Sequence, residues 1–90
     1  MGYLQTKTKN ITYTPTILRE GTGTNKTGFI EAGAFSVSIA NVGNHDDAKV
    51  NGIILKKTET LSFNAGEANF LGRLEWETGT SELLMIILRK

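Results

Sequence analysis

The stretch GNHDDAK places His45, Asp46 and Asp47 side by side, and these side chains come nearest to a metal-binding set. A bound divalent cation needs three or more ligands that converge on one point. Neighbouring side chains of an extended chain point to opposite sides, and no calcium-loop spacing is present. We therefore interpret this stretch as a solvated turn and expect no metal. A nucleophile–histidine–acid triad would need His45, the only histidine, but no serine has the G-x-S-x-G setting that would support one.

Glu75 and Glu77 are the pair of side chains that best suggests acid–base chemistry. Paired carboxylates hydrolyse glycosidic bonds when a cleft tunes one of them as the acid. These two lie two positions apart beside Trp76, so on a strand they share one face. Nothing in the flanking sequence indicates a cleft. We therefore predict solvent-facing charge, and we expect the protein not to be an enzyme.

Aromatic side chains raise the hypothesis of a carbohydrate-binding β-sandwich module used for adhesion. The residues that would form its stacking platform are Trp76, Tyr3, Tyr13 and Phe70. Trp76, however, is in register with Leu74 on its strand, which predicts that the indole lies in the core. Carbohydrate binding is therefore the alternative function.

The charge balance argues against partners that bind through a strong electrostatic field. The 90 residues carry 10 Lys and Arg against 9 Asp and Glu, a net charge of +1. We expect no binding to nucleic acid or to an anionic membrane. The stretch GTGTNKTG does not match a phosphate-binding loop, so no cofactor is expected. There is no cysteine, the N-terminus lacks an apolar signal core, and the longest apolar run is too short to span a bilayer.

Strand-forming residues fill most of the chain, and Gly, Asn and Asp punctuate it. In residues 34–43, Phe35, Val37 and Ile39 alternate with small polar or short side chains, which predicts a strand with one buried face. Asn51-Gly52 between two apolar stretches predicts a β-hairpin. Further inward-facing positions are predicted at Leu61, Phe63, Leu74 and Trp76. The even spacing predicts one small antiparallel β-sandwich, jelly-roll-like or Ig-like, of seven or eight short strands.

Residues 1–27 differ in composition from residues 28–90, which we assign to the sandwich core. The first segment holds most of the threonines, and Pro15 removes a backbone donor from its best strand. We expect an edge strand that packs on its own domain, or an arm that reaches a neighbouring molecule.

The C-terminal run LLMIIL, residues 83–88, is apolar on both faces of a strand. Such a strand needs cover on both sides. The N-terminal segment could roof it, or another subunit could do so, and the two arrangements are compatible. The expected interface residues are Leu84, Ile86, Leu88, Tyr13 and Ile17.

Four stretches carry a resemblance that covers residues 28–88: AGAFSVSIANVG, VNGIIL, ETLSF and LGRLEWETGTSELLMI. They resemble a pattern in small all-β structural proteins of bacteriophages, especially phages that infect Bacteroidetes. One departure is in the return after the hairpin, where that pattern often reads Pro-Gly-Glu and this chain has Lys57-Thr58-Glu59.

The resemblance implies a virion component: a capsid decoration or minor capsid protein, a spike, or a small tail part. It carries over scaffold residues and no active site. Such a protein would be made in the host cytoplasm and located in the virion. Its partners would be further copies of itself, other virion proteins, or both.

Overall fold

The computed structural model describes residues 6–8, 11–21, 24–66 and 70–89, with the backbone alone for residues 6–8 and 11–13. Over these residues the chain forms nine strands and no helix. The strands are β1 (Thr6–Thr8), β2 (Ile11–Glu20), β3 (Thr27–Ile30), β4 (Ser36–Asn41), β5 (Ala48–Val50), β6 (Ile53–Leu55), β7 (Thr60–Asn64), β8 (Leu74–Glu77) and β9 (Leu83–Arg89).

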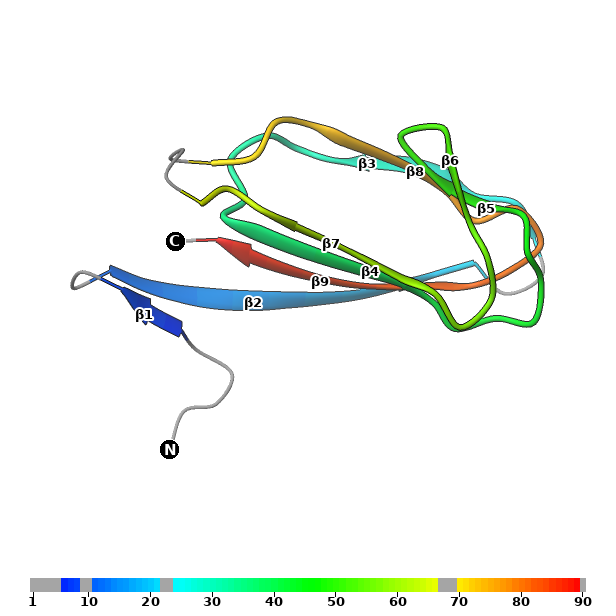
Figure 1. Cartoon of the computed structure of the whole chain (residues 1–90), viewed down its shortest axis with the longest axis horizontal. Coiled ribbons are helices and arrows are strands. Elements are labelled where there is room, and N and C mark those ends of the chain that lie inside the picture. The colour runs from blue at the N-terminus through cyan, green and yellow to red at the C-terminus, as the bar shows by residue number, and fades with distance from the viewer. Residues whose placement is uncertain (1–5, 9–10, 22–23, 67–69, 90) are drawn as a thin grey trace.

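The strands form two antiparallel sheets that pack face to face (Figure 1). One sheet has the order β1-β2-β9-β4-β7, and the other has the order β3-β8-β5-β6. Each sheet contributes one face to a shared core and turns its other face, here called the outer face, away from the partner sheet. The predicted all-β fold, a small antiparallel sandwich, is confirmed, with nine strands over the described residues where seven or eight were predicted.

Alternating side chains build the core between the sheets. In β4, Val37 and Ile39 are fully buried, whereas Ser36, Ser38 and Ala40 on the other face are only partly buried. This is the period of two that a half-buried strand requires. The buried apolar residues are Ile30, Ala34, Val37, Ile39, Ala48, Val50, Leu55, Leu74, Leu83, Met85 and Ile87.

The predicted hairpin joins β5 to β6 through Asn51 and Gly52. Both residues have positive φ, 50° and 80°, as a two-residue hairpin turn requires. Asn51 also binds the neighbouring strand: its backbone N–H donates to the Glu75 carbonyl, and its side-chain oxygen accepts from the Glu75 N–H, both at 2.8 Å. The turn is therefore tied to β8 as well as closed on itself.

Trp76 is part of the core, as its register with Leu74 predicted. It packs against the buried cluster and lies opposite Gly28 in the β3–β8 ladder. A Cβ atom at position 28 would overlap the indole ring, so the ring lies directly on the backbone of β3. The indole therefore serves in packing, although Trp76 is only partly buried.

Asn41 is a buried polar side chain that joins three segments at one end of the sandwich. Its amide nitrogen donates to the carbonyls of His45 and Leu55, both at 2.8 Å. Its oxygen accepts from the Gly43 N–H and the Ser81 hydroxyl. All of its hydrogen-bonding capacity is used, so burial of this amide carries no desolvation penalty for an unpaired group.

Thr58 adopts a backbone conformation that disfavours a β-branched residue. Its φ is 69°, in the left-handed region, within the turn that leads from β6 to β7. The turn is held by the Thr58 N–H, which donates to the Asn41 carbonyl, and by Glu59, whose carboxylate accepts from the Lys56 N–H. These bonds hold Thr58 in a conformation that glycine adopts at lower cost.

Replacing Thr58 with glycine should therefore stabilise the fold. We expect Thr58→Gly to raise the free energy of unfolding by about 1 kcal/mol, because it relieves the left-handed strain. Urea unfolding followed by tryptophan fluorescence measures the change. The matched control is Thr60→Gly in β7, where an extended residue is required and glycine should destabilise. If Thr58→Gly lowers the free energy of unfolding as Thr60→Gly does, the hypothesis of backbone strain at Thr58 is wrong.

Candidate assembly surface

The apolar strand β9 lies inside the five-stranded sheet, between β2 and β4. It pairs with β2 over residues 14–20 and with β4 over residues 36–41, so both of its edges are hydrogen-bonded. The predicted roof over β9 by the N-terminal segment is wrong: residues 11–20 lie beside β9 in the same sheet (Figure 1). By pairing with the edge of β9, β2 supplies hydrogen-bond partners to the backbone N–H and C=O groups of that edge. A segment stacked over the face of β9 would leave those groups without partners.

The two faces of β9 have different environments in the single chain. Leu83, Met85 and Ile87 point into the core and are buried. On the outer face Leu84 and Leu88 are half-buried, and Ile86 is 41% exposed. Within one chain β9 has a sheet packed on one face only, and cover of its outer face by another subunit stays a prediction.

Strand β2 extends the apolar surface of β9 sideways. Ile17 lies directly opposite Ile86 in the β2–β9 ladder and is 57% exposed, and Pro15 lies opposite Leu88. Together these side chains form a continuous band, which we call the outer strip. Its members are Pro15, Ile17, Leu84, Ile86 and Leu88. It includes four of the five predicted interface residues.

Tyr13, the fifth predicted interface residue, has a side chain that lies outside the described part of the structure. Its backbone belongs to β2 and pairs with Thr6 of β1.

Polar groups border the outer strip on the described strands. Arg19 of β2 forms an ion pair with Glu82 at one end of the strip, and the flanking strand β4 presents Ser36 and Ser38. An apolar centre with a polar border is the arrangement found at protein–protein interfaces.

The size of this face limits how strongly it can bind. Seven residues of β9 span about 23 Å, and three strands span about 14 Å, which gives a footprint of roughly 320 Å². A stable two-protein interface buries about 800 Å² on each partner. One such contact therefore supports only weak association, and a durable assembly would need other contacts beside it.

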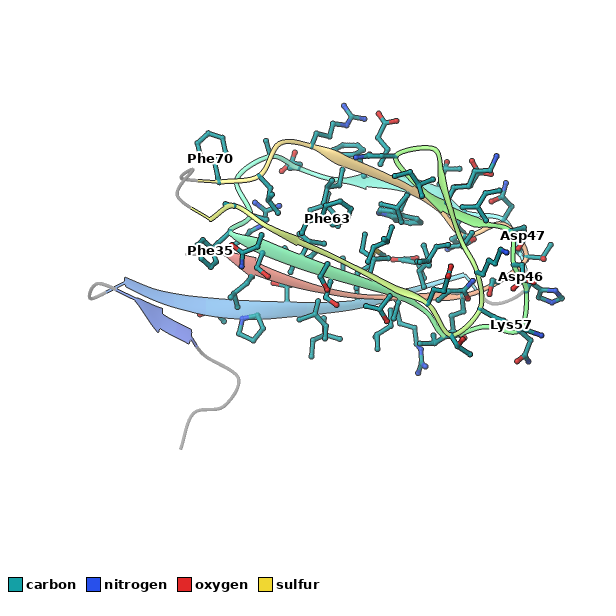
Figure 2. The ribbon with its side chains drawn as sticks, in the orientation of Figure 1. Phe35, Asp46, Asp47, Lys57, Phe63 and Phe70 are labelled. Carbon is teal, nitrogen blue, oxygen red and sulfur yellow. The ribbon has the colours of Figure 1, made fainter. Side chains whose placement is uncertain are left out.

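Asp46 and Asp47, which were considered as metal ligands, lie at the end of the sandwich opposite Phe35 (Figure 2). Both carboxylates accept hydrogen bonds that hold neighbouring loops. The Asp47 carboxylate accepts from the Thr80 N–H at 2.9 Å and the Thr80 hydroxyl at 2.8 Å. Asp46 accepts from the Lys57 N–H at 3.0 Å. The described residues contain no group of three or more His, Cys, Asp or Glu that could hold a metal. These carboxylates thus anchor loops.

The two described side chains of the hypothetical aromatic platform, Trp76 and Phe70, have different environments. Trp76 lies in the core, while Phe70 is 56% exposed at the end of the molecule near Phe35 (Figure 2). Tyr3 lies outside the described residues. The structure instead exposes Phe29, beside Glu75 on the outer face of the other sheet. Phe29 alternates with buried Ile30, and that alternation was the available sequence signal for its outward direction.

Comparisons with protein-family models, with curated proteins and with solved structures found no match to this chain. In the described residues no helix is long and apolar enough to cross a membrane. The exposed surfaces are therefore the observations that bear on function.

Asp47 should contribute a measurable part of the acid sensitivity. The backbone N–H of Thr80, and then its hydroxyl, hold the pKa of Asp47 below its ordinary value. The contribution is complete above the unfolded pKa, about 3.9, and is lost as pH falls through the lower folded pKa. We expect the free energy of unfolding to fall below about pH 4, with a shallower fall in Asp47→Asn. Urea midpoints measured at several pH values test this, and parallel curves for the two proteins would contradict it.

Neighbouring positions of β9 should differ in their tolerance of truncation. Met85→Ala should cost about 2–5 kcal/mol because it opens a cavity in the core. Ile86→Ala should cost about 1 kcal/mol or less because its side chain already contacts solvent. Chemical unfolding at low micromolar protein concentration measures both. Equal losses would show that the outer face is covered within one chain.

Proposed function

We propose that the protein is a non-enzymatic structural protein of a phage particle, which acts by assembly through the outer strip. The observation that carries the proposal is the exposed pair Ile17 and Ile86 at the centre of an otherwise half-buried apolar band. Covering these side chains removes apolar surface from water, and this favours association.

A second copy of the chain is the occupant that best fits the strip. The strip follows two adjacent, paired strands, and a two-fold axis parallel to its surface would place it against the same strip of a second copy. A net charge of +1 places little electrostatic repulsion between copies. Because one contact is weak, repetition by particle symmetry would supply the contacts that a single pair lacks.

The resemblance to small all-β phage proteins supports the particle setting. The glycine of its Pro-Gly-Glu return corresponds to Thr58, and Thr58 has the positive φ that glycine favours. The departure in sequence therefore leaves the backbone requirement of that turn in place. As a virion component, the protein would also have other virion proteins as partners.

Sedimentation of the wild-type chain over a wide concentration range tests the proposal. We expect weak, reversible association that increases with protein concentration, because a footprint of about 320 Å² is well below the roughly 800 Å² per partner of a stable interface. Ile17→Asp should abolish it, because a carboxylate would be buried without a partner. Ile86→Asp should do the same.

Ile53→Asp provides the matched control. Ile53 lies on the other sheet at 56% exposure, against 57% for Ile17, so the same substitution removes an equally exposed side chain. We expect Ile53→Asp to associate like the wild type. The proposal is ruled out if the wild-type chain stays monomeric at every concentration. It is also ruled out if Ile53→Asp loses association to the same extent as Ile17→Asp.

A further inference from the structure

A groove of about 510 Å³ lies on the outer face of the four-stranded sheet, on the side of the sandwich away from the outer strip. Strands β3, β5 and β8 and the β5–β6 turn form it. Its principal side chains are Phe29, Lys49, Asn51, Arg73, Glu75 and Glu77. This volume lies within the range of about 300–1,000 Å³ that is usual for small-molecule sites.

Strand register brings these side chains together from three distant parts of the chain. Strand β8 lies between β3 and β5, and its Leu74 and Trp76 belong to the core. Glu75 and Glu77 alternate with them and therefore point to the outer face. Glu75 lies opposite Phe29, and Glu77 lies opposite Lys49.

The charges in the groove balance one another. Arg73 lies 3.7 Å from the Glu75 carboxylate, and Lys49 is the ladder partner of Glu77. Two cations and two carboxylates leave no net charge, so neither an anion nor a cation gains a favourable field. Hydroxyl groups suit this arrangement, because each one donates to a carboxylate and accepts from an ammonium, guanidinium or amide N–H.

Phe29 supplies an apolar surface within this polar setting. Its side chain is 47% exposed, and the Arg73 guanidinium carbon lies 3.8 Å from the ring centroid. That cation–π contact holds the ring in place. The remaining exposed part of the ring is available to the C–H face of a sugar.

We propose that this groove binds a neutral oligosaccharide, whose hydroxyls contact Glu75, Glu77 and Lys49 and whose ring packs on Phe29. The proposed sugar contact is Phe29; Trp76 also lines the groove, but its indole packs against the core. The inference goes beyond the proposed assembly function and uses a different face. Either can fail without affecting the other.

Binding is tested with the labelled full chain on an array of neutral, acidic and amine-bearing oligosaccharides and short peptides. Cellopentaose, maltopentaose, mannopentaose and the strongest neutral binder from the array are then titrated against the ¹⁵N-labelled protein. We expect saturable binding of at least one neutral oligosaccharide, with amide shifts at Phe29, Asn51 and Glu75. No neutral binder, shifts outside the groove, or stronger binding of acidic ligands, amines or peptides would overturn the proposal.

Two variants and one control connect binding to the groove. Phe29→Ala should weaken binding about tenfold, the loss expected for one aromatic contact. Glu77→Gln keeps the side chain's size, removes an acceptor charge and should also weaken binding. Phe70→Ala removes an exposed phenylalanine that does not line the groove and should bind like the wild type. Equal affinity in Phe29→Ala and Phe70→Ala would overturn the assignment.

Discussion

The pairing of β9 on both edges is the constraint on which the rest of the structure depends. One ladder holds β2, and with it the N-terminal part of the sheet, and the other holds β4, which in turn pairs with β7. The same strand supplies Leu83, Met85 and Ile87 to the core. A chain of this size buries a modest fraction of its surface, so few other contacts could replace that contribution. The last strand is therefore the one that joins the sheet into a single unit.

The two outer faces of the sandwich have contrasting chemistry, although both belong to the same small domain. The face of β2 and β9 is an apolar band with a polar border, whereas the face of β3, β8 and β5 is a polar groove with one aromatic ring. The carboxylates that might have suggested catalysis hold loops, as Asp47 does, or stand beside cations, as Glu75 does.

Local patterns predicted most of the strands, because alternation and turn chemistry are properties of neighbouring residues. The strand around Val37 and the Asn51-Gly52 hairpin are examples. Pairing partners were harder to predict, because they depend on segments far apart in the chain. A run that is apolar on both faces, such as the one around Met85, does not show which face is inner or what covers the other. The groove was missed for a similar reason, since Phe29, Lys49 and Glu77 meet only through strand order.

The uniform apolarity of β9 also affects how its register is chosen. In most half-buried strands, a register shift by one residue would turn the apolar side chains to solvent. The lost burial of apolar surface makes that shift unfavourable. In β9 such a slip would exchange Met85 for Ile86 at little hydrophobic cost, so the pattern alone leaves two alignments close in energy. Anchors at its ends must decide between them. The Ser81 hydroxyl is fixed on buried Asn41, and the Arg89 guanidinium binds the carbonyls of Glu31 and Ala32. Correct threading of the last strand thus depends on a few polar contacts at its ends.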